Sequence, residues 1–334
     1  MSFTEDELAE TLRKILGGDH PGVRLGPGDD AALVDPSRHL TVLTVDMLVE
    51  GVDFERATAT PRDVGYKAIA VNVSDVAAMG GSPRFALSAA GFPETTETGW
   101  IIELFAGMRE AADEYAMAVV GGDLSRADRV VLSVTVTGEV PDGGAVMRTG
   151  ARPGDRIVVT GALGAAAGGL RLLRAPAQSV AHVIGTPWAR ELVAAQSRPA
   201  ARLGEGRTLA RHGARAMIDV SDGLTLDLAR LCRAGGVGAA ITLGVVPVAD
   251  TVRLLGEVMP VEPLALALEG GEDFELLAAL PPDAVEGATK DLHERFGTPL
   301  TDIGEFREGS GLVAVGSAGS ERPLEPKGWD HFGS

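Results

Sequence analysis

The sequence predicts a two-domain protein whose first half is a mixed α+β domain. The chain has 334 residues, which is enough to bury a large core and more than one domain usually holds. In the first half, segments with helical spacing of apolar residues are interspersed with β-branched, strand-like segments. The turn-forming segment 141–144 (Pro-Asp-Gly-Gly) separates two well-patterned halves, so we expect domains at 1–143 and 144–334.

The expected elements of the first half follow from these patterns. Helices are predicted where apolar residues recur every three or four positions, at 3–16, 67–81 and 99–115. Strands are predicted where β-branched and apolar residues run together, at 39–49, at 85–91, from 116 into a Gly-Gly-Asp turn at 121–123, and at 130–140.

The helix expected at 67–81 is small and apolar and ends at a glycine pair, where a left-handed cap costs little. Asn72 and Asp75 are three residues apart and therefore lie together on one side of it. An aspartate inside such a helix costs stability unless a positive charge meets it, and a structural salt bridge is the simplest explanation. The expected core face on the other side consists of Tyr66, Ile69, Ala70, Val73 and Ala77.

Further acidic residues stand near the ends of predicted elements. Asp30 follows Asp29 in a glycine-rich turn that leads into a short strand, and such pairs are also common in surface turns. Asp46 interrupts a strand, where aspartate is unfavourable, and Asp123 lies in the turn after its strand. Elements that carry polar residues at their ends often converge on a ligand.

The strongest local signal of the second half is the segment 214–229, a short strand followed by an acidic turn and a helix. The turn holds Asp219, Ser221 and Asp222. A serine or aspartate there would cap the helix, which accounts for one acidic residue but not for two.

Other segments of the second half carry weaker signals. Glu272 and Asp273 follow two glycines and precede an apolar strand, and Trp329 lies near the end of the chain as a packed lid or a ligand contact. The glycine-rich segment 161–170 opens a helix but fits neither common phosphate-loop pattern, so we favour close helix packing as its explanation. The helical region 171–201 is expected to break at Pro187.

Composition excludes several classes of function. The net charge of −17 argues against nucleic-acid binding through a basic surface. A single cysteine, Cys232, excludes an intramolecular disulfide and a Cys-rich metal site. We expect a soluble, cytoplasmic protein, because the N-terminus lacks a signal-peptide pattern and no apolar run is long enough to span a membrane.

The acidic residues lack a matching set of arginines, and gathered carboxylates repel each other unless they are protonated or bridged by cations. Oxygen ligands suit Mg²⁺, and the histidines show no zinc-type spacing. Magnesium would also let an acidic protein hold phosphates. Multi-metal phosphoryl chemistry is therefore favoured over a structural divalent-cation site or unrelated surface acids.

The chain resembles the thiamine-monophosphate kinase family over nearly its whole length, because a set of individually weak motifs occurs in the family's order. These motifs are Gly-Pro-Gly-Asp-Asp-Ala-Ala (26–32), Asp-Met-Leu-Val-Glu-Gly-Val (46–52), Lys-Ala-Ile-Ala-Val-Asn-Val-Ser-Asp-Val-Ala-Ala-Met-Gly (67–80), Gly-Gly-Asp (121–123), Arg-Thr-Gly-Ala-Arg-Pro-Gly-Asp (148–155), Asp-Val-Ser-Asp-Gly-Leu (219–224) and Gly-Gly-Glu-Asp-Phe-Glu-Leu (270–276).

The resemblance implies the two-domain fold of aminoimidazole ribonucleotide synthetase, with an N-terminal α+β domain that pairs in a homodimer and a C-terminal α/β domain. It implies in-line phosphoryl transfer from ATP to thiamine phosphate with several Mg²⁺ ions, and Asp75, Asp46 and Asp123 as the catalytic residues. The implied magnesium ligands are Asp30, Thr44, Asp46, Asp75, Asp123, Asp219 and Asp222. The implied nucleotide contacts are Gly122, Asp123, Arg148 and Ser221, and the implied thiamine phosphate contacts are Asp53, Glu272 and Trp329.

The chain departs from the family pattern at Val45, Asp53 and Leu124, where the family commonly has threonine, histidine and threonine. Other enzymes of the superfamily fit less well. Selenophosphate synthetase needs a reactive cysteine or selenocysteine and a partnering lysine near the N-terminus, and the hydrogenase maturation protein needs a C-terminal cysteine. Aminoimidazole ribonucleotide synthetase and a non-catalytic nucleotide-binding protein remain as alternatives.

Overall fold

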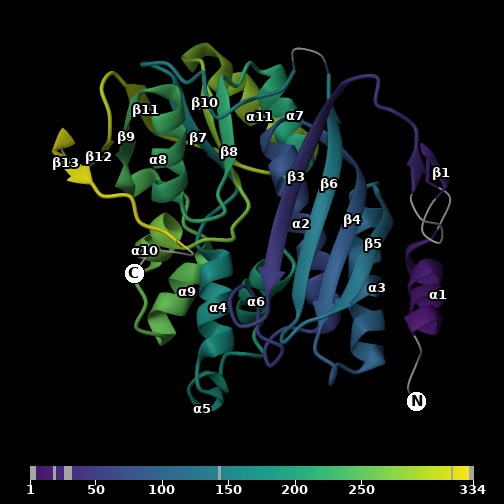
Figure 1. Ribbon diagram of the computed structural model, residues 1–334. Coiled ribbons are helices and arrows are strands. Elements are labelled where there is room, and N and C mark those ends of the chain that lie inside the picture. The colour runs from purple at the N-terminus through teal and green to yellow at the C-terminus, as the bar shows by residue number, and fades with distance from the viewer. Residues whose placement is uncertain (1–4, 18–19, 26–31, 142–143, 317–318, 331–334) are drawn as a thin grey trace. The chain divides into compact units, whose positions relative to one another are not determined.

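The computed structural model describes residues 5–17, 20–25, 32–141, 144–316 and 319–330 (Figure 1). The chain divides into two compact units, one formed by residues 1–76 and 81–142 and the other by residues 77–80 and 143–334. Within the described ranges, no helix is long and apolar enough to cross a membrane.

The first unit contains a four-stranded sheet in the order β3-β6-β4-β5, in which only β4 and β5 run parallel. The predicted helices and strands of this unit are confirmed, although α2 begins six residues before its expected start and β1 was not predicted. Strand β5 continues through the expected turn at 121–123, with a register shift against β4 between Val119 and Gly121. The elements are α1 (Glu5–Leu16), β1 (Val23–Leu25), β2 (Leu33–Val34), β3 (Leu40–Val49), α2 (Pro61–Ala78), β4 (Ser82–Phe92), α3 (Thr98–Glu114), β5 (Ala118–Arg126) and β6 (Val131–Val140).

Helices α2 and α3 cover one face of this sheet (Figure 1). They approach closely through glycines: a Cβ on Gly65 of α2 would lie 1.8 Å from the carbonyl oxygen of Leu104, and one on Gly107 of α3 would lie 1.9 Å from that of Arg62. The predicted core face of α2 is buried, but so are Lys67, Asn72 and other residues around the helix. The prediction that only one side of α2 faces the core was therefore wrong, because the helix is enclosed on nearly all sides.

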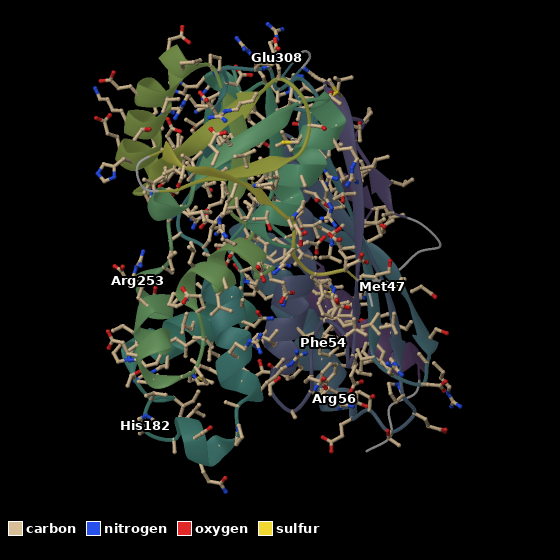
Figure 2. The ribbon with its side chains drawn as sticks, turned by 90° about the vertical axis from the view of Figure 1, so that its left-hand side faces the viewer. Met47, Phe54, Arg56, His182, Arg253 and Glu308 are labelled. Atoms are coloured by element: carbon tan, nitrogen blue, oxygen red, sulfur yellow. The ribbon has the colours of Figure 1, made fainter. Side chains whose placement is uncertain are left out.

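The other face of the sheet exposes apolar side chains. Leu43, Val45 and Met47 of the edge strand β3 are 57–70% exposed, and Leu87 of β4 is 48% exposed. The ladder places Val45 and Leu87 on either side of Thr135, so these residues share one surface; Met47 is labelled in Figure 2. We call these four apolar residues the open sheet face. Contiguous apolar patches on soluble proteins commonly mark interaction sites.

The second unit contains a seven-stranded sheet in the order β13-β12-β9-β11-β7-β10-β8, in which every neighbouring pair except β9 and β12 is antiparallel. Its elements are β7 (Arg156–Thr160), α4 (Ala165–Arg174), α5 (Ala177–Val180), α6 (Pro187–Ser197), α7 (Leu203–Arg211), β8 (Ala216–Asp219), α8 (Leu224–Gly235), β9 (Gly238–Thr242), η1 (Leu243–Val245), α9 (Asp250–Val258), α10 (Pro263–Glu269), β10 (Leu276–Leu280), η2 (Pro282–Ala284), α11 (Val285–Phe296), β11 (Leu300–Arg307), β12 (Leu312–Val315) and β13 (Glu321–Leu324).

Both faces of this sheet are buried. Ile157 and Val159 of β7 face a core shared with α4, α6 and α8, whereas Val158 faces a second core shared with α7 and α11. Pro187 begins helix α6, and Thr186 caps it by accepting a hydrogen bond from the Ala189 N–H. The helical region is thus interrupted at 181–186, directly before Pro187, and proline suits the first turn of the new helix, where its missing N–H is not needed.

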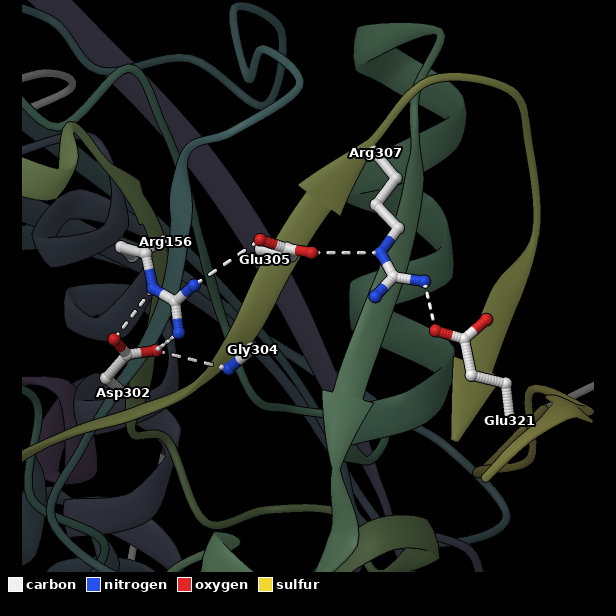
Figure 3. A network of polar contacts seen from close by, with 6 residues as sticks. All are labelled: Arg156, Asp302, Gly304, Glu305, Arg307 and Glu321. Atoms are coloured by element: carbon white, nitrogen blue, oxygen red, sulfur yellow. Dashed lines mark hydrogen bonds and ion pairs between the residues drawn. The ribbon is translucent and has the colours of Figure 1, made fainter. Parts of the chain in front are cut away.

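A chain of ion pairs crosses the sheet between β7, β11 and β13 (Figure 3). Arg156 pairs with Asp302 at 2.8 Å and with Glu305 at 3.5 Å, and Arg307 pairs with Glu305 at 3.1 Å and with Glu321 at 2.6 Å. These side chains are about one third or more exposed, so each pair contributes little stability. The network links β7 to β11 and β11 to β13, and it contains none of the predicted site residues.

Candidate functional site

In the first unit, three predicted magnesium ligands lie on the helix-covered side of the sheet. Thr44 and Asp46 are two residues apart on β3 and therefore point to the same face. The Thr44 hydroxyl donates a hydrogen bond to the Asp75 carboxylate in the middle of α2. The structure thus joins Asp75 to a hydroxyl group from the strand that carries Asp46. These oxygen atoms are the ligand type that Mg²⁺ prefers.

Asp123 lies away from this group. It pairs with Ala89 on β4, and Ala89 in turn pairs with Ser133, which stands opposite Met47. Asp123 therefore lies on the same side of the sheet as the open sheet face, on the edge strand opposite to β3. The strand spacing separates the two edges by roughly 14 Å. Within one unit the sheet does not bring Asp123 together with Asp46.

Gly122 and Asp53 each have a local structural role. A Cβ on Gly122 would lie 2.0 Å from the Ser88 carbonyl oxygen, so the close contact between β4 and β5 requires glycine there. The Asp53 carboxylate accepts a hydrogen bond from the Val49 N–H at 2.8 Å, within the turn that follows β3. Asp30 lies outside the described residues.

In the second unit, Asp219 ends β8 and Asp222 lies in the turn before α8. The prediction that a serine or aspartate of this turn caps α8 was wrong, because the N-cap residue is Gly223, which has no side chain to accept a hydrogen bond. Asp227, inside the helix and fully buried, instead accepts the backbone N–H groups of Ser221, Asp222 and Gly223 at 2.9–3.1 Å. Burial raises the pKa of Asp227 above its ordinary value.

Arg230 is a charge partner that the sequence interpretation missed. Its guanidinium lies 2.5 Å from the Asp222 carboxylate and 2.7 Å from that of Asp227. The only available signal was the three-residue spacing between Asp227 and Arg230 on one helix. Asp222 therefore has a basic partner, contrary to the expectation that the acidic residues lack arginines.

Backbone hydrogen bonds bring two predicted substrate contacts to the same turn. The Glu272 N–H donates to the Ser221 carbonyl at 2.8 Å, and the Trp329 N–H donates to the Asp222 carbonyl at 2.9 Å. Trp329 is half exposed. Arg148 is exposed and follows Met147, whose carbonyl accepts the Met217 N–H of strand β8 at 3.1 Å. The segments that carry Glu272 and Trp329 thus both meet the acidic turn, and the segment before Arg148 pairs with strand β8.

The glycine-rich segment before α4 is occupied by a side chain of the chain itself. The Asp273 carboxylate accepts the N–H groups of Gly164 at 2.7 Å and Ala166 at 3.2 Å, at the N-terminus of α4. A Cβ on Gly169 would lie 2.0 Å from the Leu192 carbonyl oxygen of α6. Close helix packing therefore explains that glycine, as predicted.

Replacing Asp273 by Asn is expected to change how stability depends on pH. Burial raises the pKa of Asp273 from 3.8 to about 7. A raised carboxyl pKa stabilises the fold fully below the unfolded pKa, and this contribution is lost as the pH rises through about 7. Relative to Asp273→Asn, we expect the wild type to lose on the order of 3 kcal/mol of unfolding free energy between pH 4 and 8. Urea unfolding of both proteins across this range measures the difference, and a constant difference would contradict the prediction.

Within the part of the chain that the structure describes, no three Asp, Glu, His or Cys side chains lie close enough to hold a metal ion by themselves. The predicted ligands are instead distributed between the units. In one unit Thr44 is hydrogen-bonded to Asp75 and shares its face of β3 with Asp46. In the other unit, Asp219 and Asp222 flank the acidic turn.

The chain matches known proteins over most of its length. Residues 28–140 match the AIR synthase related protein N-terminal domain, and residues 152–317 match the corresponding C-terminal domain. The curated thiamine-monophosphate kinase of Aquifex aeolicus is 35% identical over 305 residues, which cover 91% of this chain and 92% of that protein.

Two solved structures are similar in both sequence and fold. The thiamine-monophosphate kinase of Stenotrophomonas maltophilia is 35% identical, with a TM-score of 0.81 over 96% of this chain and 98% of that one. A structure described as AaThiL complexed with AMPPCP and TMP is 33% identical, with a TM-score of 0.79 over 99% of this chain and 100% of that one. The two-domain mixed fold predicted from the motifs is confirmed, and the chain belongs to the thiamine-monophosphate kinase family.

Proposed function

We propose that this chain transfers the γ-phosphoryl group of ATP to thiamine phosphate, giving ADP and thiamine diphosphate. The observation that carries this proposal is the similarity to a protein whose structure is described as a complex with AMPPCP and TMP, over nearly the full length of both chains. Relatives named thiamine-monophosphate kinase support the same activity.

The acceptor in this reaction is a phosphate oxygen of the substrate, which is already anionic and needs no general base. The protein must therefore position two phosphates and offset their repulsion, which is how phosphoryl transfer is generally catalysed. The residues of the candidate site suit this task, because their carboxylate and hydroxyl oxygens can bind cations that offset the phosphate charge.

The donor set fits Mg²⁺. Magnesium commonly takes one or two carboxylates and completes its octahedron with water and substrate phosphates. In the described parts of both units, no three carboxylates gather at one point. A group of one or two carboxylates suits magnesium that also binds water and substrate phosphates. Thr44, Asp46 and Asp75 would hold Mg²⁺ in the first unit, and Asp219 and Asp222 in the second. Bound Mg²⁺ would neutralise phosphate charge, which a chain of net charge −17 needs.

The other predicted roles remain part of this proposal. Asp30 and Asp123 would complete the magnesium ligands. Gly122, Asp123, Arg148 and Ser221 would contact the nucleotide, and Asp53, Glu272 and Trp329 would contact thiamine phosphate. The meeting of Ser221, Glu272 and Trp329 around one turn supports their assignment to neighbouring ligands.

A product assay tests the proposed function. Purified protein is incubated with ATP, Mg²⁺ and either thiamine phosphate or free thiamine, and the products are separated by chromatography. We expect thiamine diphosphate from thiamine phosphate, and no phosphorylation of free thiamine. Protein that phosphorylates another acceptor and yields no thiamine diphosphate would refute the assignment.

We also propose that the chain forms a homodimer through the open sheet face. Pairing with a second copy would bury Leu43, Val45, Met47 and Leu87, which are otherwise exposed to water. Asp123 lies on the same face, so this pairing would place it at the interface.

Replacing Val45 by Asp is expected to produce monomers, because a charge in an apolar interface must lose its hydration without gaining a partner. Analytical ultracentrifugation measures the oligomeric state. Val245→Asp is a matched control, since Val245 is an exposed apolar residue of the second unit, and we expect it to remain dimeric. A dimer that persists in Val45→Asp would place the interface elsewhere.

A further inference from the structure

The loop between helix α10 and strand β10 contains two non-glycine residues in the left-handed backbone conformation. The φ angle is +68° at Glu272 and +50° at Phe274. Side chains other than glycine rarely adopt this conformation, because the Cβ atom crowds the backbone. Such strain persists only where the surrounding structure enforces it, and it clusters at functional sites. The two strained residues flank Asp273.

Asp273 and its neighbours fix this loop. The Asp273 carboxylate is bound at the N-terminus of α4, where the helix dipole favours a negative charge. On one side the Glu272 N–H donates to the Ser221 carbonyl at 2.8 Å, and on the other the Phe274 N–H donates to the Val220 carbonyl at 2.9 Å. The backbone that carries Glu272 is therefore tied both to α4 and to the segment that follows β8.

Gln196 directs the side chain of Glu272. Its Nε2 atom donates a hydrogen bond to Glu272 Oε2 at 2.5 Å, and the Gln196 residue is only 6% exposed. Among the residues that the structure describes, its Oε1 atom is buried without a hydrogen-bond partner. A buried acceptor that lacks a donor costs stability. The strained backbone at Glu272 and Phe274 and the unsatisfied Oε1 of Gln196 thus both occur in the contacts that fix Glu272.

We propose that Gln196 and Asp273 are positioning residues of the thiamine phosphate site. Asp273 fixes the backbone that presents Glu272, and Gln196 sets the direction of the Glu272 carboxylate. This inference rests on the proposed function, because it requires Glu272 to contact thiamine phosphate. A carboxylate that is already oriented loses less conformational freedom when the substrate binds.

The variant Gln196→Met tests this role, because methionine has nearly the same length and removes both the donor and the unsatisfied oxygen. We expect the KM for thiamine phosphate to rise about tenfold, while kcat and the KM for ATP change less than about twofold. We expect the melting temperature to stay the same or to rise, since the unsatisfied acceptor is gone. A purely structural role would instead lower the melting temperature and leave the KM for thiamine phosphate unchanged.

Asp155→Asn is the control for general damage to the unit. Asp155 is buried and pairs with Arg215 at 2.5 Å, and it is not among the proposed site residues. We expect this variant to melt at a lower temperature with both KM values unchanged. If Asp155→Asn also changed the KM for thiamine phosphate, this KM would depend on the stability of the unit. A raised KM in Gln196→Met would then no longer support a positioning role.

A double-mutant cycle with Glu272→Gln tests whether Gln196 acts through Glu272. If it does, Gln196→Met raises the KM in the wild type but has no further effect in Glu272→Gln. Equal effects in both backgrounds, or an unchanged KM in an active Gln196→Met enzyme, would overturn the positioning role alone. A wild-type protein that forms no thiamine diphosphate would overturn the proposed function itself.

Discussion

Replacing Asp75 by Asn is expected to abolish turnover while leaving the fold intact. Asparagine has the same shape, and its side-chain oxygen can still accept the hydrogen bond that Thr44 donates to Asp75. The substitution removes the negative charge that would hold Mg²⁺ beside the substrate phosphates. We expect kcat to fall by about 10³-fold or more, which corresponds to about 4 kcal/mol of transition-state stabilisation. Steady-state formation of thiamine diphosphate measures the loss, and circular dichroism checks the fold.

Asp63→Asn is the matched control for this prediction. Asp63 lies on the same helix α2 and also accepts a hydrogen bond from a threonine hydroxyl, that of Thr60, at 2.6 Å. It belongs to the first helical turn and to none of the proposed ligand groups. We expect this variant to retain normal activity. If Asp75→Asn were also nearly as active as the wild type, Asp75 would not be a magnesium ligand.

Most helices and strands of the first unit could be predicted because their signals are local. The strand β3 and the helix α3 were expected within about one residue of their observed ends, from β-branched runs and from helical spacing alone. The continuation of β5 through Gly122 was not predictable in this way. A glycine pair usually indicates a turn, and only the Ser88 carbonyl on the neighbouring strand shows why glycine is required within a strand.

The residues of the candidate site could be named from the sequence, but their arrangement could not. The family resemblance implied Thr44, Asp46 and Asp75 as ligands, and the structure joins Thr44 to Asp75. The strand order β3-β6-β4-β5 determines the edge at which Asp123 lies, and the register determines its face; both depend on pairings between distant segments. The contact between Arg230 and Asp222 also depends on the path of the turn between them. Local sequence patterns do not encode such long-range geometry.

Replacing Asp227 by Asn is expected to cause the largest loss of stability at the acidic turn. One carboxylate oxygen of Asp227 accepts the three backbone N–H groups of the turn, and the other contacts Arg230. Asparagine offers one acceptor oxygen, so its NH₂ group must face either the backbone N–H groups or the guanidinium, and both are donors. We expect the unfolding free energy to fall by about 3 kcal/mol. Chemical unfolding followed by circular dichroism measures this loss.

Combining Asp227→Asn with Arg230→Met separates this conflict from a general loss of packing. With the guanidinium removed, the asparagine oxygen can accept the backbone N–H groups while its NH₂ group no longer faces a cation. We therefore expect the double variant to lose at least about 1 kcal/mol less than the sum of the two single variants. Losses that simply add would mean that Asp227 stabilises the turn independently of Arg230. A smaller combined loss would instead show that the buried Asp227 carboxylate organises both the backbone of the turn and Arg230, which pairs with Asp222. The geometry of the candidate ligand Asp222 would then depend on Asp227, a residue outside the recognised motifs.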